Sequence, residues 1–210
     1  MRVILFDLDG TLIDSTHAIL EGFEVTFKKF GLNPPANEEV KKLIGLPLDI
    51  MFSRLGVREN IDKFVQTYKN HYQKIALQKT KLLPFAKEAI KEASEFAKLG
   101  IVTTKTGVYS RDLLQHFGVW DYFEVLIGRE DVINPKPHPE PILKALVKMG
   151  ALNEKTYMIG DTCLDMVSAK SAGVTGVGVL WEYEGENIRK CADLVKKDAL
   201  EAVRHIKLYL

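Results

Sequence analysis

Cysteine is scarce in this sequence, since Cys163 and Cys191 are the only two among 210 residues. Two cysteines are too few for a disulfide framework or for a zinc site built from thiolates, and a reducing, cytoplasmic setting fits best. No apolar run approaches the ~20 residues that a membrane-spanning helix needs. The apolar run at residues 3–6 ends at Asp7 and is too short for the hydrophobic region of a secretion signal. We therefore expect no membrane association.

An excess of charge of either sign is also missing. Lys and Arg number 29 against 28 Asp and Glu, which leaves a formal charge of +1 with no basic block. That balance argues against a nucleic-acid partner and against a polybasic membrane anchor. Hydrophobic residues make up 46% and charged residues 27%, as in ordinary globular proteins. The length suits one α/β core, alone or with a small accessory domain.

Short apolar runs recur along the chain. The first, V-I-L-F at residues 3–6, is continuous and ends in acidic residues and a glycine, which is typical of a strand buried on both faces of a parallel sheet. Similar runs follow at residues 100–103, 124–128, 157–160 and 176–180. Helical patterns lie between them, at residues 86–99, 111–117 and 141–149, each followed by a glycine that stops a helix. This alternation predicts an α/β fold with a doubly wound parallel sheet.

Residues 15–79 break the alternation. They contain helical patterns with no convincing strand, separated by glycines and by the Pro34-Pro35 pair. The patterns lie at residues 18–30, 38–44, 48–55 and 61–76. We interpret 15–79 as a small all-helical domain inserted after the first strand, with residues 1–14 and 80–210 forming the core.

Two acidic pairs follow strand ends. Asp7 and Asp9 stand two residues apart, so in extended backbone both side chains leave the same face, beyond the first strand. Asp161 follows a later strand, and Asp165 lies four residues on, on the same face of a helix that begins there. Each pair has a simpler interpretation, as a turn before Gly10 or as a helix cap. Carboxylates gathered at one sheet edge repel one another, however, and a bound cation would offset this repulsion. Mg²⁺ is the cation expected if a phosphate also binds there.

Two further residues could bind a phosphate. Thr103 ends a strand within T-T-K-T-G; its hydroxyl either caps the next helix or, with nearby amides, holds phosphate oxygens. Lys136 lies in N-P-K-P-H-P-E-P. It is either a solvated loop lysine or, because prolines stiffen the backbone on both sides, an ammonium aimed at a fixed point.

Taken in order, the segments D-L-D-G-T, I-V-T-T-K, P-K-P-H-P and G-D-T-C-L-D resemble the four motifs of the haloacid dehalogenase-like hydrolase superfamily. The resemblance covers the whole chain, with the helical insertion similar to the cap domain that follows the first motif. The most similar branch is that of the phosphoglycolate phosphatases and their pyrophosphatase relatives. The resemblance implies a Mg²⁺-dependent phosphatase that acts on a small phosphorylated metabolite.

The resemblance also implies roles for single residues. Asp7 would attack phosphorus, and Asp9 would act as general acid and then as general base. Thr103 and Lys136 would bind the phosphoryl group. Relatives commonly carry Asn directly after this threonine, whereas this chain has Thr104. The resemblance implies that Thr104 lies at the phosphate or the substrate.

Mg²⁺ would be held by the Asp7 carboxylate, the Asp9 main-chain carbonyl and Asp161. Asp165 would support the metal shell or Lys136. Substrate selection is expected from the inserted domain, with the loop at residues 45–47 as a candidate.

Several alternatives remain. Dehalogenation at carbon needs no acid two residues after the nucleophile, so Asp9 argues against it. A pyrophosphatase, a sugar-phosphate phosphatase or a phosphomutase would share the site. Phosphonate hydrolysis would use a cap lysine, whereas Lys41 and Lys42 are expected to be solvated helix charges. A phospho-receiver domain would carry its aspartate on a mid-chain strand and lack the insertion. Nothing in the sequence indicates an oligomeric state.

Overall fold

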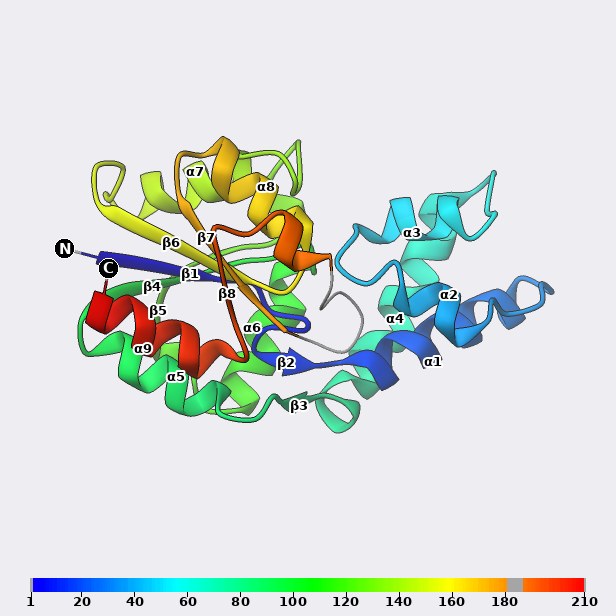
Figure 1. The fold of residues 1–210 in the computed structure, drawn as a ribbon. Helices are drawn as coiled ribbons and strands as arrows, with labels where there is room; N and C mark the ends of the chain where they lie inside the picture. The colour runs from blue at the N-terminus through cyan, green and yellow to red at the C-terminus, as the bar shows by residue number, and fades with distance from the viewer. Residues whose placement is uncertain (1, 181–186, 210) are drawn as a thin grey trace.

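The computed structural model describes residues 2–180 and 187–209. Within them, six strands form one parallel sheet with the order β5-β4-β1-β6-β7-β8 (Figure 1). The strands are β1 (Arg2–Phe6), β4 (Ala97–Val102), β5 (Phe123–Ile127), β6 (Lys155–Gly160), β7 (Thr175–Val179) and β8 (Leu194–Lys196). The predicted doubly wound parallel sheet is confirmed.

The central strand shows why its sequence is apolar without a break. Val3, Ile4, Leu5 and Phe6 are all fully buried, because helices cover both faces of the sheet. Ile4 and Phe6 belong to a core that includes residues of α5 (Ala86–Ser94), α6 (Gly107–His116) and α9 (Ala199–Tyr209). Val3 and Leu5 face the opposite core, with α7 (Glu140–Lys148) and α8 (Cys163–Ser171). Figure 1 shows α7 and α8 on one side of the sheet and α5 and α9 on the other.

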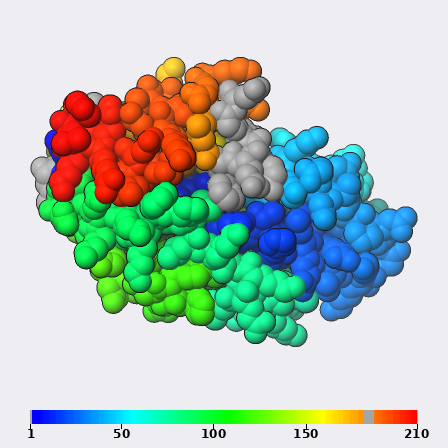
Figure 2. Space-filling model, turned by 60° about the horizontal axis from the view of Figure 1, so that its bottom comes forward, coloured from blue at the N-terminus to red at the C-terminus, as the bar shows by residue number. Residues whose placement is uncertain are grey.

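Four helices fill residues 16–79, which we call the helical segment. They are α1 (Thr16–Lys29), α2 (Asn37–Lys41), α3 (Leu48–Arg54) and α4 (Ile61–Lys79). The helices pack on one another through aromatic rings, with Phe23 in contact with Phe52 and with Tyr68 at centroid distances of 4.7 and 5.1 Å. Figure 1 shows this segment, in blue to cyan, beyond one end of the strands of the sheet, and Figure 2 shows its atoms gathered at one end of the molecule. Its behaviour as a separate domain stays a prediction.

A short ladder joins the two ends of the helical segment. β2 (Ile13–Asp14) and β3 (Lys81–Leu82) pair antiparallel where the chain leaves the sheet region and returns to it. Neither strand could be predicted from the sequence, because two residues carry no measurable periodicity. The strand β8 and the helix α9, which packs beside α5, were not predicted either. No helix among residues 2–180 and 187–209 is long and apolar enough to cross a membrane.

The predicted end of the first helix after the helical segment is wrong. The helix expected at residues 86–99 ends at Ser94, and Gly100 lies inside β4 instead of stopping a helix. A side chain at Gly100 would meet Val125 and Leu5 at 2.7 and 2.8 Å, so the glycine is there for close packing. The glycines that follow α6 and α7 do adopt the left-handed conformation, with φ of +66° at Gly118 and +62° at Gly150.

Candidate active site

The three strands that precede the candidate residues are neighbours. β1 lies between β4 and β6 in register, so the residues that follow them emerge side by side at the carboxyl edge of the sheet. Asp7 follows β1, Thr103 follows β4 and Asp161 follows β6; all three are buried. The structure thus brings together residues that are more than 150 positions apart in the sequence. This edge is where open α/β sheets bind their ligands.

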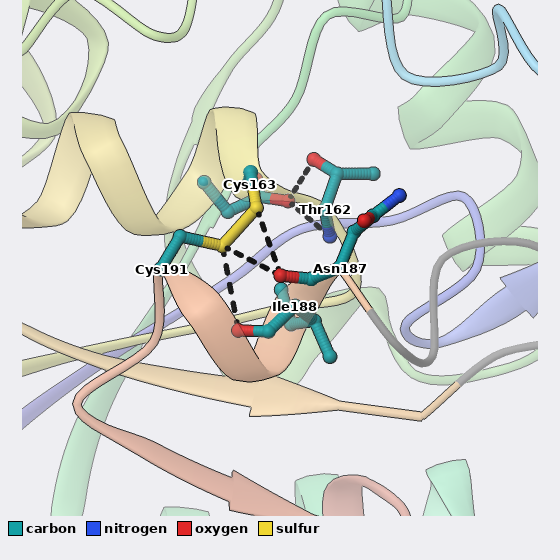
Figure 3. The surroundings of a disulfide bond; sticks show 6 residues. Thr162, Cys163, Asn187, Ile188 and Cys191 are labelled. Carbon is teal, nitrogen blue, oxygen red and sulfur yellow. Dashed lines mark hydrogen bonds between the residues drawn. A yellow bond between two sulfur atoms is a disulfide. The ribbon is translucent and has the colours of Figure 1, made fainter.

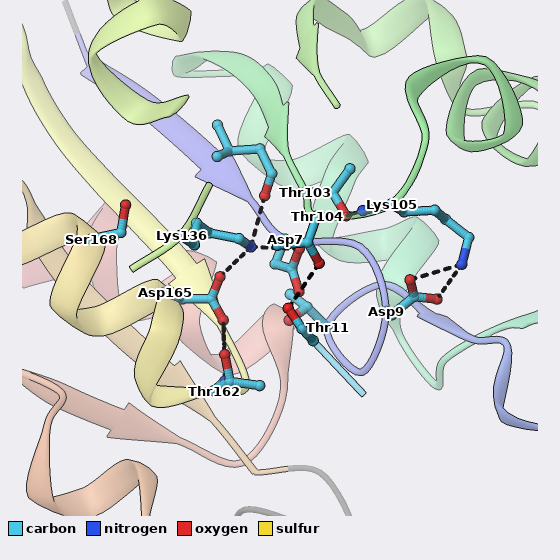
Figure 4. Close-up of polar contacts among 12 residues, drawn as sticks. Asp7, Asp9, Thr11, Thr103, Thr104, Lys105, Lys136, Thr162, Asp165 and Ser168 are labelled. Atoms are coloured by element: carbon cyan, nitrogen blue, oxygen red, sulfur yellow. Dashed lines mark hydrogen bonds and ion pairs between the residues drawn. The ribbon is translucent and has the colours of Figure 1, made fainter. Parts of the chain in front are cut away.

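Lys136 reaches this edge from the loop before α7, and its side chain is 3% exposed. Its ammonium donates to Asp7 Oδ1 at 2.8 Å, to Asp165 Oδ1 at 2.5 Å and to the Val102 carbonyl at 3.0 Å (Figure 4). These acceptors match the three protons of an ammonium. The solvated-loop interpretation of Lys136 is therefore wrong, because the ammonium is held in one position beside Asp7.

Asp165 fixes that ammonium. Its second oxygen accepts hydrogen bonds from the Thr162 backbone N–H at 3.2 Å and the Thr162 hydroxyl at 2.7 Å, at the start of α8. The packing is tight, since a Cβ at Gly160 would lie 2.4 Å from the Asp165 carboxyl carbon. Both oxygens of Asp165 are thus engaged, one by the helix cap and one by Lys136. This arrangement suits a residue that positions Lys136.

Asp161 packs against the turn after β1. Its Oδ1 accepts a hydrogen bond from the Thr11 hydroxyl at 3.2 Å. Gly10 approaches the carboxylate so closely that an added Cβ would lie 2.1 Å from Oδ2, and its φ of +79° also favours glycine. The D-G-T sequence after the first strand therefore supplies both the turn and the contact with Asp161.

Negative charge exceeds positive charge at this edge. Oxygens of Asp7, Asp161 and Asp165 all lie within 4.8 Å of one another, and the Lys136 ammonium pairs with Asp7 and Asp165 but not with Asp161. Burial, together with the neighbouring carboxylates and against the pull of Lys136, raises the pKa of Asp7 to about 7. The same causes raise the pKa of Asp161 well above its usual value. Burial opposes the charge on Lys136, but Asp165 and Asp7 raise its pKa above the usual value. A divalent cation fits this set of buried oxygen ligands.

Asp9 does not join this cluster. Its carboxylate accepts hydrogen bonds from the Lys105 ammonium at 3.1 and 2.9 Å and from the Ser15 hydroxyl. Figure 4 shows the Asp9 and Lys105 side chains turned toward one another. Burial opposes the charge on Lys105, but Asp9 raises its pKa above the usual value. Lys105 was not among the residues predicted for the site, although it directly follows Thr103 and Thr104 in the motif T-T-K.

The two threonines have different surroundings. Thr103 Oγ1 accepts the Lys105 backbone N–H at 3.2 Å, beside the acidic cluster. The Thr104 hydroxyl donates to the Gly45 carbonyl at 2.8 Å. Thr104 therefore ties the sheet edge to the helical segment, and the loop at residues 45–47 does reach the site.

A cavity of about 320 Å³ opens between the sheet edge and the helical segment. Asp9, Thr104 and Lys105 line it from the sheet side. Leu46 and Tyr72 are among the residues that line it from the helical segment. The cavity can hold a small molecule next to Asp9 and Lys105, with polar and apolar side chains in its walls.

A disulfide lies next to the site. Cys163 and Cys191 are bonded, which ties the first residue of α8 to the residue after the short helix Ile188–Lys190 (Figure 3). Cys163 stands two residues from both Asp161 and Asp165. This bond was not predicted from the sequence, because two cysteines 28 residues apart carry no signal of pairing. The low cysteine content therefore no longer supports a reducing compartment.

Comparisons with known proteins agree with this geometry. A family model described as haloacid dehalogenase-like hydrolase matches residues 4–179. A protein named pyrophosphatase PpaX in Oceanobacillus iheyensis is 36% identical over 191 residues, which cover 90% of this chain and 88% of that protein. A phosphoglycolate phosphatase of Aquifex aeolicus is 34% identical over 206 residues, which cover 93% and 96%. The crystal structure of a haloacid dehalogenase-like hydrolase from Bacteroides fragilis superposes with a TM-score of 0.89 at 28% identity, covering 95% and 98%.

Proposed function

We propose that this chain, a phosphatase that belongs to the haloacid dehalogenase-like hydrolases, hydrolyses a small phosphorylated metabolite through an acyl phosphate of Asp7 (an aspartyl phosphate). The observation that carries the proposal is the Asp7 carboxylate at the end of β1, held by a buried ammonium on one oxygen. Lys136 fixes that carboxylate in one position and is itself fixed by Asp165. A carboxylate oriented in this way is suited to attack on phosphorus.

Mg²⁺ is the cofactor we propose. The Asp7 and Asp161 carboxylates and the Asp9 main-chain carbonyl would hold it, while Asp165 is engaged by Lys136 and Thr162. When bound, the cation would offset negative charge on the phosphoryl oxygens. The excess of buried carboxylates over ammonium groups supports this assignment.

The chain's own residues supply the remaining chemistry. In the first step a carboxylate oxygen of Asp7 forms a bond to phosphorus as the bond to the leaving-group oxygen breaks, and Asp9 gives that oxygen a proton. Lys136 and Thr103 bind the phosphoryl oxygens while the phosphoryl group is transferred to Asp7. In the second step water attacks the phosphorus of phospho-Asp7 and Asp9 takes its proton. Phosphate and free Asp7 result.

For the substrate we propose 2-phosphoglycolate, with pyrophosphate as the second candidate. Relatives of nearly equal similarity carry both names. Lys69, Lys105 and Arg129 line the cavity and would suit a substrate with a second anionic group. The helical segment would act as a cap, with the loop at residues 45–47 and Thr104 at the substrate.

A substrate panel tests this proposal. Purified protein with Mg²⁺ is assayed against 2-phosphoglycolate, pyrophosphate, sugar phosphates and p-nitrophenyl phosphate, with Asp7→Asn as the inactive control. We expect 2-phosphoglycolate to give the highest kcat/KM. A clearly higher value for a sugar phosphate would overturn the substrate assignment, and full turnover by Asp7→Asn would overturn the nucleophile.

A further inference from the structure

The pair of Lys105 and Asp9 is buried at the cavity wall. The side chains are 9% and 13% exposed, and the ammonium donates to both carboxylate oxygens. Lys105 also lies over the ring of Tyr72, 4.7 Å from its centroid. Breaking such a pair without a replacement leaves a charge buried and uncompensated, which is costly.

The proposed chemistry requires that this pair break. Asp9 has to turn toward the leaving-group oxygen, and a carboxylate that accepts both hydrogen bonds from an ammonium cannot serve as a proton donor there. Once Asp9 turns away, Lys105 keeps the Tyr72 ring as a neighbour but loses its anion. A substrate that brings an anion of its own to Lys105 removes that cost.

The hydroxyl of Tyr72 also supports an anionic ligand at Lys105. Tyr72 is 1% exposed and lines the cavity; its hydroxyl lies close enough to the Lys105 ammonium to contribute to the raised pKa of Lys105, yet it makes no hydrogen bond of normal geometry among the described residues. Buried hydroxyl groups are normally satisfied, so an orphan beside a cavity calls for a ligand. An anion at Lys105 would accept a hydrogen bond from the Tyr72 hydroxyl as well.

We infer that Lys105, with the Tyr72 hydroxyl, binds a second anionic group of the substrate and that this group takes the place of Asp9, which is thereby released to act at the leaving group. The inference rests on the proposed function, because it takes Asp9 as the proton donor. It restricts the substrate class to phosphoesters or phosphoanhydrides that carry a second anion a few bonds from phosphorus.

The local geometry keeps the phosphoryl site and the anion site at Lys105 close together. Lys105 follows Thr103 by two residues and its backbone N–H donates to the Thr103 hydroxyl, so the stem of Lys105 is anchored beside the phosphoryl site. Asp9 follows Asp7 by two residues. A carboxylate or a second phosphate adjacent to the transferred group meets Lys105 at this range, whereas a neutral sugar ring does not compensate it.

Non-hydrolysable ligands test the inference without turnover. With Mg²⁺ present, the dissociation constants of 3-phosphonopropionate, an isostere of 2-phosphoglycolate, and of propylphosphonate, which lacks the carboxylate, are measured by calorimetry. We expect the wild type to prefer the first ligand by about 10- to 100-fold. Lys105→Met should lose most of this preference and Lys105→Arg should restore much of it. Equal affinities in the wild type, or an unchanged preference in Lys105→Met, would overturn the inference.

Two further variants control for the possibility that Lys105→Met changes the affinities by disturbing the fold. Tyr72→Phe removes only the unpaired hydroxyl, so it should keep its thermal stability while the preference falls by a smaller factor than in Lys105→Met. Lys98→Met removes a lysine at the opposite end of β4, paired with Glu124, and should keep the wild-type preference. If Lys105→Met does not fold, an unchanged preference in Tyr72→Phe overturns the shared site.

Turnover separates this inference from the proposed function. Wild type and Lys105→Met are compared by their kcat/KM on two esters, 2-phosphoglycolate and 2-hydroxyethyl phosphate, the second of which is matched in length but lacks the carboxylate. We expect a loss at least 10-fold larger for 2-phosphoglycolate. A wild type that hydrolyses neither ester contradicts the proposed function. Equal losses on both esters contradict the role of Lys105 and leave the phosphatase activity intact.

Discussion

Removing the charge of Asp7 should stabilise the metal-free protein, and by more at high pH. The pKa of Asp7 is raised in the folded protein from 3.8 to about 7, chiefly by burial. Between these values the folded state binds more protons than the unfolded state. The stabilising contribution of protonated Asp7 is therefore complete below pH 3.8 and is lost as the pH rises through 7. Asp7→Asn keeps nearly the same shape and has no such loss.

The size of the effect follows from the shift. Each pKa unit corresponds to about 1.4 kcal/mol, so wild type loses roughly 3 kcal/mol relative to Asp7→Asn between pH 5 and pH 8. Urea unfolding of both proteins in excess chelator, at pH 5 and pH 8, measures this difference. Asp121→Asn, at an exposed position, is the matched control and should show no comparable change.

Mg²⁺ should act in the opposite direction and favour the wild type. The cation stabilises the folded wild type by binding to it, and Asp7→Asn loses one of the proposed ligands. Saturating Mg²⁺ at pH 8 is therefore expected to raise the free energy of unfolding more for wild type than for the variant. An advantage of Asp7→Asn that is independent of pH, or a wild type that gains stability from pH 5 to pH 8 without metal, would refute the reasoning.

Three further outcomes are expected. Turnover should require Mg²⁺ and be inhibited by excess Ca²⁺, which prefers more ligands and looser geometry; full activity after exhaustive chelation would contradict this. Asp9→Asn should slow the phosphorylation of Asp7 by an alkyl phosphate about 10²–10⁴-fold but its phosphorylation by p-nitrophenyl phosphate much less, because nitrophenolate leaves without a proton; equal losses on both substrates, without a burst of nitrophenolate, would mean that Asp9 only supports the structure. Cys191→Ser should lower the free energy of unfolding by on the order of 3–4 kcal/mol, because the bond to Cys163 closes a loop of 28 residues; an unchanged urea midpoint, with two free thiols in the untreated protein, would argue against the bond.

Much of the fold could be predicted because it depends on local pattern. Apolar runs marked the strands, and glycines marked most helix ends, as Gly118 and Gly150 show. Gly100 failed as a helix stop because its reason is a close approach to Val125 and Leu5, which only the assembled sheet creates. Strands of two or three residues, such as β2, β3 and β8, are too short to show a period.

Part of the candidate site could likewise be predicted from the sequence, and part could not. Residues that directly follow strand ends, such as Asp7 and Asp161, could be grouped because parallel strands end at one edge. The partners of Asp9 could not be assigned, since the contact with Lys105 spans 96 positions and depends on side-chain direction. The tie between Thr104 and Gly45 likewise depends on how the helical segment packs over the sheet edge.

The central claim is that the phosphoryl group passes through Asp7. Asp9→Asn is mixed with p-nitrophenyl phosphate and Mg²⁺ and then quenched in acid, and its peptides are analysed by mass spectrometry. A burst of nitrophenolate near one equivalent per active site is expected, with one phosphoryl group on the peptide that contains Asp7. Turnover with no labelled peptide, or a label on a peptide without Asp7, would contradict the account.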